Sequence, residues 1–288
     1  MIPPFALHRP TTVEEATSLM AQLEDASFYS GGTELTLLLK MGLAQFEHLI
    51  DIKGIDELRG IDRQDEALRI GAASTHAQVE YSPLVQSTAP GLAAMERWVA
   101  NVRVRSTGTI GGNLCFAEPH SDPATFFIAW GADLELVRGT ERRRRPVDGF
   151  VTGALETDRK VDELLVSVLL PDLPANTTVV HQKVQLIQRP AASVAVRLGL
   201  TDDRFANVRV AVGSVGEIPM LIPEAAHAVE GLDIGQAVVA FKEAGRVSAA
   251  RSEPFEDLNG SVAYKRHLVS VLVRRGLENA LTEVQRHD

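Results

Sequence analysis

Two glycine pairs constrain this sequence more than any other feature. The first lies in Ser30-Gly31-Gly32-Thr33-Glu34-Leu35 and the second in Thr109-Ile110-Gly111-Gly112-Asn113. Glycine lacks Cβ, so the backbone can turn sharply and a ligand can approach its N–H groups. Consecutive N–H groups can form a nest that binds phosphate. Two such segments therefore predict two clamps on one long, phosphate-bearing ligand, and the alternative is two ordinary tight turns.

The residues around the first glycine pair predict a strand, a turn and a helix. Ala26–Tyr29 is predicted to be a short strand, and Glu34–Met41 a helix that ends at Gly42. A helix start offers unpaired N–H groups to an anion. Before them, Thr12 and Glu15 predict a capping box at the start of an amphipathic helix.

Composition excludes several classes of protein. The chain has 288 residues, of which 45% are hydrophobic and 23% charged, which is enough for two or three globular domains. Its net charge of −9 argues against a nucleic-acid binder. We find no apolar run long enough to span a membrane and no secretory signal, so we expect a cytoplasmic protein.

The single cysteine, Cys115, limits what this chain can ligate by itself. It excludes an internal disulfide and an iron–sulfur cluster held by this chain alone, since such a cluster normally needs four thiolates. We interpret Cys115 as a small buried side chain in preference to a reactive thiol.

Charged residues flank the second glycine pair. Arg103 and Arg105 precede it and either neutralise a phosphate or lie on the solvated surface. Asp122 opens a predicted helix that ends at Trp130, and it either caps that helix, accepts a hydrogen bond from a sugar hydroxyl, or does both. His120 is interpreted as an isolated histidine without a functional role.

The rest of the chain predicts further strands and helices in an α+β arrangement. We interpret the basic run 142–145 as a solvated hairpin tip in preference to a patch for an acidic partner, and 173–178 as a domain junction. The expected strands are His48–Ile52, Leu68–Gly71, Ala132–Arg138, Leu164–Leu170, Ala192–Leu200 and Val208–Val215, and the expected helices are Thr75–Tyr81, Gly91–Val99, Pro223–Glu230, Ile234–Ala249 and Val262–Glu283.

Several common catalytic motifs are missing from the sequence. There is no dinucleotide fingerprint of the Gly-x-Gly-x-x-Gly type, no P-loop, no nucleophile elbow and no metal-ligand spacing. We therefore expect no catalytic residue and no metal site in this chain. A protein with ligand-cradling segments but no acid, base or nucleophile suits chemistry that belongs to a cofactor.

Together these motifs resemble the FAD-binding medium subunit of molybdenum hydroxylases, the group of xanthine dehydrogenase and carbon monoxide dehydrogenase. The resemblance rests on the two glycine segments and on Pro119-x-x-Asp122, and it extends over nearly the whole chain. Further matches are His8-Arg9-Pro10, Asp51-Ile52, Ile55-x-Glu57-Leu58, Leu164-Leu165 with Pro171, and Asp257 with Tyr264-Lys265-Arg266.

The resemblance implies an α+β fold of the vanillyl-alcohol-oxidase type. An FAD-binding domain would span residues 1–175, in lobes of about 1–58 and 59–175, and a small α+β domain would span 176–288. The FAD contacts that it implies are Phe28, Tyr29, Ser30, Gly31, Gly32, Thr33, Glu34 and Leu35, then Thr109, Ile110, Gly111, Gly112 and Asn113, and finally Asp122, Leu165 and Lys183.

The resemblance also implies a subunit that works within a larger enzyme. A large molybdenum-cofactor subunit would hydroxylate the substrate, and a small subunit with two [2Fe–2S] clusters would pass electrons to FAD on this chain, in a dimer of heterotrimers. The external acceptor would be NAD⁺, a quinone or oxygen. The segment Gln188-Arg189-Pro190-Ala191-Ala192 departs from the family pattern and leaves open the redox tuning of the flavin and its final acceptor. A self-sufficient FAD oxidase and a non-catalytic nucleotide-binding module are the alternatives.

Overall fold

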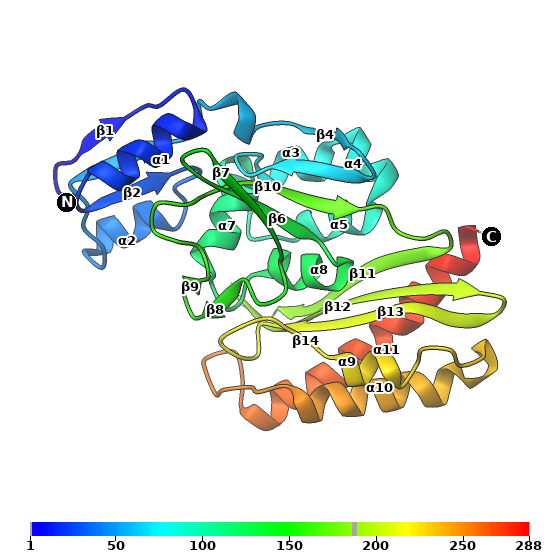
Figure 1. Cartoon of the computed structure of the whole chain (residues 1–288). Helices are drawn as coiled ribbons and strands as arrows, with labels where there is room; N and C mark the ends of the chain where they lie inside the picture. The colour runs from blue at the N-terminus through cyan, green and yellow to red at the C-terminus, as the bar shows by residue number, and fades with distance from the viewer. Residues whose placement is uncertain (1, 186–188, 288) are drawn as a thin grey trace.

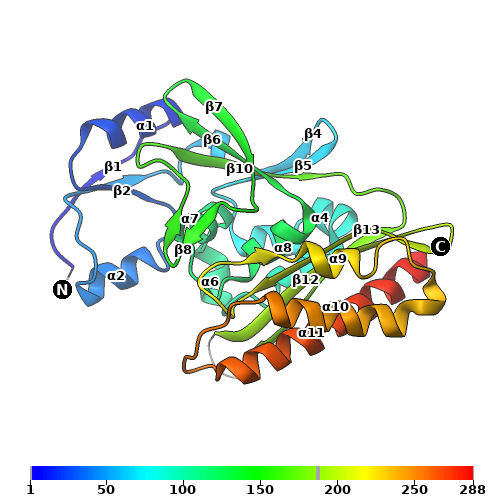
Figure 2. The same ribbon diagram turned by 60° about the horizontal axis from the view of Figure 1, so that its bottom comes forward.

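The computed structural model describes residues 2–185 and 189–287 and arranges them around three main β-sheets. The N-terminal sheet lies far from the two long C-terminal helices, and the central sheet lies between them (Figures 1 and 2). Helices and strands are mixed in each part, which confirms the predicted α+β class.

A parallel three-stranded sheet, in the order β1-β3-β2, forms the N-terminal lobe. Its elements are β1 (Ala6–His8), α1 (Val13–Gln22), β2 (Ala26–Tyr29), α2 (Leu35–Met41), β3 (His48–Asp51) and the 3₁₀ helix η1 (Asp56–Leu58). Thr12 caps α1 by accepting a hydrogen bond from the Glu15 backbone N–H at 3.1 Å. The Glu15 carboxylate accepts from the backbone N–H of Thr11, not Thr12, so only half of the predicted capping box forms. Gly42 ends α2 with a φ of 71°, as predicted.

An antiparallel sheet in the order β4-β5-β10-β6-β7 organises the central part. Its strands are β4 (Ile61–Gln64), β5 (Ala67–Gly71), β6 (Asp133–Arg138), β7 (Glu141–Pro146) and β10 (Leu164–Pro171), with a small hairpin of β8 (Val151–Gly153) and β9 (Glu156–Thr157). Its helices are α3 (His76–Tyr81), α4 (Pro83–Thr88), α5 (Pro90–Glu96), α6 (Val102–Thr107), α7 (Ile110–Phe116) and α8 (Asp122–Trp130).

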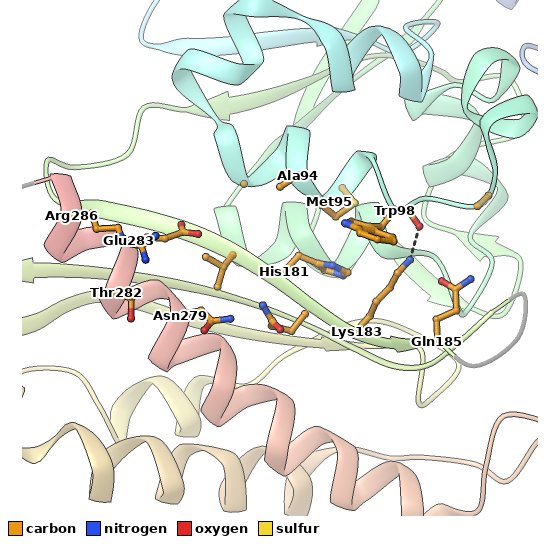
Figure 3. A pocket seen from close by; sticks show the side chains of 14 residues that line it. Ala94, Met95, Trp98, His181, Lys183, Gln185, Asn279, Thr282, Glu283 and Arg286 are labelled. Carbon is orange, nitrogen blue, oxygen red and sulfur yellow. Dashed lines mark hydrogen bonds between the residues drawn. The ribbon is translucent and has the colours of Figure 1, made fainter.

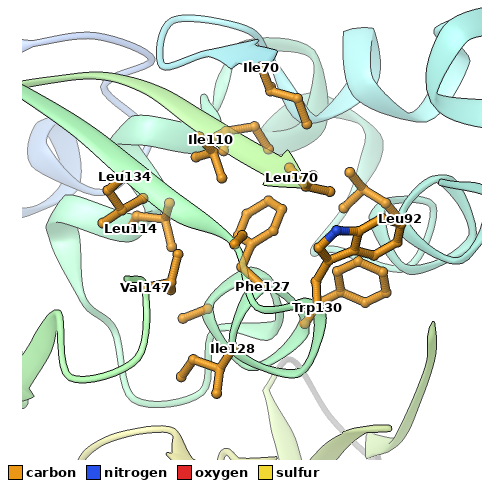
Figure 4. Close-up of a cluster of buried hydrophobic side chains, with 14 of the residues drawn as sticks. Ile70, Leu92, Ile110, Leu114, Phe127, Ile128, Trp130, Leu134, Val147 and Leu170 are labelled. Carbon is orange, nitrogen blue, oxygen red and sulfur yellow. The ribbon is translucent and has the colours of Figure 1, made fainter. Parts of the chain in front are cut away.

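The core of the central part joins this sheet to its helices. Ile70 of β5 and Leu170 of β10 face Ile110, Phe127 and Trp130 from the helices (Figure 4). Trp130 is buried, and its indole N–H donates to the Pro171 carbonyl at 2.9 Å, so the polar atom of this large side chain is satisfied. The core therefore fixes α7 and α8 against the sheet.

The C-terminal part has an antiparallel sheet in the order β11-β12-β13-β14. Its elements are β11 (Thr177–Gln185), β12 (Pro190–Thr201), β13 (Arg204–Gly213), β14 (Met220–Leu221), α9 (Pro223–His227), the 3₁₀ helix η2 (Ile234–Gln236), α10 (Ala237–Arg251) and α11 (Val262–His287). α8 covers one face of this sheet, and α11 covers the other with α10 packed against it (Figure 1). Both faces of β12 are covered, which explains why this strand is apolar almost throughout.

Two sequence-based expectations about this architecture were wrong. The basic run 142–145 forms strand β7 and not a hairpin tip. Three of its four arginines pair with acidic residues of the same chain. Arg142 pairs with Glu57, Arg143 lies 2.5 Å from Glu163 and 3.2 Å from Asp158, and Arg145 also pairs with Asp158. These partners lie far away in the sequence, so the run gives no sign of them, and it is not a free patch for an acidic partner.

Strand β11 was missed, because the predicted domain junction at 173–178 overlaps its start. The strand alternates polar and apolar residues only weakly, from Thr177 to Gln185. It is stabilised by nine paired positions along β12, such as Lys183 opposite Ser193. None of the helices within residues 2–185 and 189–287 is long and apolar enough to cross a membrane.

Candidate flavin site

The two glycine segments lie side by side in the structure. The hydroxyl groups of Ser30 and Thr109 are 3.0 Å apart and share a hydrogen bond. A Cβ on Gly31 would come within 2.2 Å of the Thr107 carbonyl oxygen, so only glycine permits this approach. Tertiary packing thus joins two turns that the sequence separates, around a cavity of about 690 Å³.

The first segment presents free hydrogen-bond donors to this cavity. In the described part of the chain, the backbone N–H groups of Gly31, Gly32, Thr33 and Glu34 have no hydrogen-bond acceptor. All four residues line the cavity. Gly32 has a φ of +68°, which favours glycine and turns the backbone there. Consecutive free N–H groups suit an anion such as a phosphate.

The second segment differs from the predicted nest. It is the first turn of helix α7, and the N–H groups of Ile110, Gly111, Gly112 and Asn113 are already bonded within the chain. Ile110 donates to the Ser74 carbonyl, Gly111 to the Ala72 carbonyl, and Gly112 to the Thr109 hydroxyl. These four N–H groups are therefore not free donors for a phosphate, and contact between this segment and the cofactor stays a prediction. What it offers is open space, since a Cβ on Gly112 would meet only the Thr109 hydroxyl within 4 Å.

Asp122 forms a buried charge cluster at another wall of the cavity. Its carboxylate lies 2.6 Å from the Lys183 ammonium and 3.4 Å from His181 Nε2. Burial alone would raise the pKa of Asp122, but the hydrogen bonds and charges of His181 and Lys183 outweigh it and lower the pKa. Asp122 makes no side-chain cap to its own helix. The carboxylate is therefore stabilised in its ionised form, and its two partners, His181 and Lys183, both belong to strand β11.

His120 is not isolated, contrary to the sequence-based interpretation. Its Nδ1 lies 3.0 Å from Glu118 and its Nε2 3.0 Å from Asp257. Asp257 also pairs at 2.8 Å with Lys265, whose side chain is fully buried. Burial would raise the pKa of Asp257, but hydrogen bonds from Lys265, His120 and Asn259 hold it well below its usual value. This cluster links the cavity rim to the start of α11, and the partners are too distant in sequence to suggest it.

The structure brings most of the predicted cofactor residues to one cavity. Tyr29 and Ile110 lie outside its lining: Lys53 stacks on the Tyr29 ring at 3.9 Å, and Ile110 is buried in the core. The predicted residues that line the cavity are Phe28, Ser30, Gly31, Gly32, Thr33, Glu34, Leu35, Thr109, Gly111, Gly112, Asn113, Asp122, Leu165 and Lys183.

Cys115 and the two arginines before the second glycine segment can now be compared with their sequence-based interpretations. Cys115 also lines the cavity, and burial raises the pKa of its thiol, which disfavours the reactive thiolate. Arg105 pairs with Glu80 at 3.2 Å and, like Arg103, is absent from the lining. Gln188, where the chain departs from the family pattern, lies outside the described residues.

Sequence reasoning missed several lining residues, including His76, Glu118, Arg159 and Arg189. Arg159 lies 5.9 Å above the Phe28 ring and donates to three backbone carbonyls, among them that of Glu163 at 2.6 Å. Arg189 pairs with Glu118. No local pattern marks these residues, because each reaches the cavity through contacts made by the tertiary fold.

A second cavity of about 880 Å³ lies between α5, β11 and α11 (Figure 3). Lys183 stands between the two cavities, and its ammonium also donates to the Trp98 carbonyl at 2.8 Å. This second cavity is not lined by either glycine segment, so we assign the phosphate-bearing ligand to the 690 Å³ cavity.

Comparison with known proteins identifies the ligand class. Residues 3–173 match the FAD binding domain in molybdopterin dehydrogenase, and residues 189–280 match the CO dehydrogenase flavoprotein C-terminal domain. The free donors of the first segment and the open space beside Gly112 fit the diphosphate of FAD.

Relatives resemble the chain over its full length. The carbon monoxide dehydrogenase medium chain of Hydrogenophaga pseudoflava is 33% identical over 97% of this chain and 98% of its own. The nicotine 6-hydroxylase medium subunit of Paenarthrobacter nicotinovorans is 29% identical with the same coverage. A solved structure of the Hydrogenophaga carbon monoxide dehydrogenase, lacking the Mo-pyranopterin moiety, superposes with a TM-score of 0.94 at 32% identity and covers 98% of this chain and 99% of its own. The chain therefore belongs to the molybdenum hydroxylase family, as an FAD-binding medium subunit of these oxidoreductases.

Proposed function

We propose that this chain receives electrons from [2Fe–2S] clusters of a partner subunit and passes them to an external acceptor. When bound, FAD supplies the chemistry, because a flavin accepts electrons singly and releases them as a pair. The observation that carries the proposal is the full-length match to medium chains together with the cavity that both glycine segments line. The chain's single cysteine means that the clusters must lie on another subunit.

We propose a place for each part of FAD along the lining of this cavity. Free N–H groups from Gly31 to Glu34 would hold the diphosphate. Gly112 would let the cofactor pass close to α7, since it carries no side chain on that side. Asp122 would accept a hydrogen bond from a hydroxyl of the cofactor, while Leu165 and Lys183 would lie near the flavin ring.

The proposed function also implies a domain organisation for this chain and a set of partner subunits. We propose an FAD-binding domain over residues 1–175 and a C-terminal domain over 176–288. The proposal is supported by a hydrophobic core made only of C-terminal residues, although Val179, Ala195 and Ala211 pack into the core of the central part. The complete enzyme would contain a large molybdenum-cofactor subunit and a small iron–sulfur subunit, as a dimer of heterotrimers. A cytoplasmic location stays a prediction.

Electron flow can be tested on the purified complex with and without its flavin. The complex is first reduced with dithionite and then mixed with NAD⁺, a soluble quinone or oxygen, while cluster absorbance is followed by stopped flow. We expect rapid cluster reoxidation only when FAD is present, and only with the physiological class of acceptor. Acid release and chromatography should identify the flavin as FAD. Equal rates in the flavin-free complex would refute the proposed electron path.

A further inference from the structure

His76 lies at the start of α3 and is locked beside the second glycine segment. Its backbone N–H donates to the Gly108 carbonyl at 3.1 Å, and the Ile110 N–H donates back to Ser74 at 3.0 Å. Thr75 and Thr109 form an antiparallel bridge between these two bonds. The backbone therefore fixes where the His76 ring can lie.

One edge of the ring is held by a buried carboxylate. His76 Nδ1 lies 2.7 Å from Glu96 Oε2, and the two side chains are 2% and 0% exposed. This contact leaves Nε2 on the other edge of the ring. Among the residues that the structure describes, Nε2 has no hydrogen-bond partner, and it is not one of the fully enclosed unpaired atoms. Since His76 lines the 690 Å³ cavity, Nε2 is its polar atom available to a ligand there.

The free edge of the ring lies where the two glycine segments meet. A Cβ on Gly108 would be 3.3 Å from His76 Cδ2, the atom bonded to Nε2, and 3.5 Å from the Thr33 hydroxyl. A Cβ on Gly31 would be 2.8 Å from the Gly108 Cα. The ring therefore borders the free N–H groups of Gly31 to Glu34, at the anion-binding end of the cavity.

The other basic side chains of the described cavity lining already have partners. Lys183 pairs with Asp122, Arg189 with Glu118, and His120 with two carboxylates, while Arg159 donates to backbone carbonyls. The N–H groups of the second segment are also taken. Among the described lining residues, His76 is thus the basic side chain beside the first segment that has an uncommitted nitrogen.

We propose that His76 binds the diphosphate of FAD through Nε2–H, while Glu96 holds the ring and balances its charge. The inference rests on the proposed position of FAD in this cavity. An imidazolium between a buried carboxylate and a phosphate makes a charge-assisted hydrogen bond at each nitrogen. The ring thereby adds a side-chain donor to the backbone donors of the first segment.

The test compares ligands with and without a diphosphate. His76→Phe keeps a ring but leaves Glu96 buried and unpaired, so the double variant His76→Phe/Glu96→Met removes the pair together and protects the fold. The complete complex is stripped of flavin and titrated with FAD, ADP and riboflavin. We expect FAD and ADP to bind about 10- to 100-fold more weakly, the loss of one charge-assisted hydrogen bond. Riboflavin affinity should change by less than about threefold.

Arg105→Met is the matched control. Arg105 is a nearby cation that pairs with Glu80 and does not line the cavity, so its loss should leave FAD affinity unchanged. The ³¹P resonances of bound FAD should shift in the double variant and not in the control. Unchanged FAD affinity in the folded double variant, or an equal loss for riboflavin, would overturn the role of His76. Neither result would affect the proposed function, which fails if the wild-type complex binds no FAD or reoxidises its clusters equally fast without flavin.

Discussion

Adjacent glycines at 111 and 112 have opposite surroundings, although the sequence presents them as one motif. A Cβ on Gly111 would lie 2.6 Å from the Ala72 Cβ, within the core beneath α7. A Cβ on Gly112 would meet only the Thr109 hydroxyl, at 2.8 Å, and would otherwise point into open space. Neither glycine has a positive φ. The first is thus required for packing, and we infer that the second is required for the cofactor.

Valine at each position should separate these two requirements. Gly111→Val should destabilise the protein by about 1–3 kcal/mol, because the core must shift to admit it. Gly112→Val should cost about 1 kcal/mol at most, through its contact with the Thr109 cap, but should abolish FAD binding. Circular dichroism melts report stability, and flavin absorbance per folded chain reports binding. A folded Gly112→Val protein with full FAD occupancy would show that the segment is only a turn.

At the scale of elements, a charge cluster connects the segment before α8, which contains His120, with the segment before α11, which contains Asp257. Asp257 lies within 3.0 Å of both Lys265 and His120, and Asn259 donates to it through its backbone at 2.8 Å. Lys265 has a fully buried side chain, and Asp257 is its ion-pair partner at 2.8 Å. The cluster therefore holds the C-terminal helix against the rim of the cavity.

Stability should depend on pH through this cluster. The pKa of Asp257 is lowered in the folded protein, so its contribution is present above the unfolded carboxyl pKa. It should be lost as pH falls below about 5, through the lowered folded value. Asp257→Asn should cost about 2–5 kcal/mol at neutral pH, since it leaves a buried lysine unpaired, and should flatten the acid limb. Urea denaturation between neutral and acid pH measures both effects, and identical pH profiles for the two proteins would contradict this account.

At the scale of the whole molecule, exposed apolar side chains near α2 are consistent with the proposed assembly with partner subunits. Met41 and Leu43, at the end of α2, are 62% and 68% exposed, and Leu37 of the same helix is 47% exposed. Apolar side chains gathered in this way often mark contacts with other proteins. The full-length relatives named as medium chains or subunits point in the same direction.

The chain should therefore behave differently alone and with its partners. Expressed alone, it should contain no iron, show no substrate dehydrogenase activity, and aggregate or unfold readily. Co-expressed with the large and small subunits, it should form a dimer of heterotrimers. Light scattering and metal analysis distinguish these outcomes. A stable, monodisperse monomer would count against an obligate subunit, and stoichiometric iron in the isolated chain would contradict the cysteine argument.

The sequence by itself determined the α+β class, most helices and strands, and the family. These follow from local signals: the cap at Thr12, the glycine that ends α2, the apolar strand Leu164–Pro171, and the two glycine motifs. Such signals depend on neighbours a few residues away, so they can be recognised in the sequence without knowledge of the tertiary structure.

Only the tertiary structure decided what those motifs do. It showed that the N–H groups of both glycines in the second segment are bonded inside the chain, that three arginines of β7 have internal partners, and that β11 is a strand. It also brought His76, Glu96 and the first glycine segment together. Hydrogen-bond satisfaction and charge pairing are settled between residues that are distant in sequence, so no local pattern reports them.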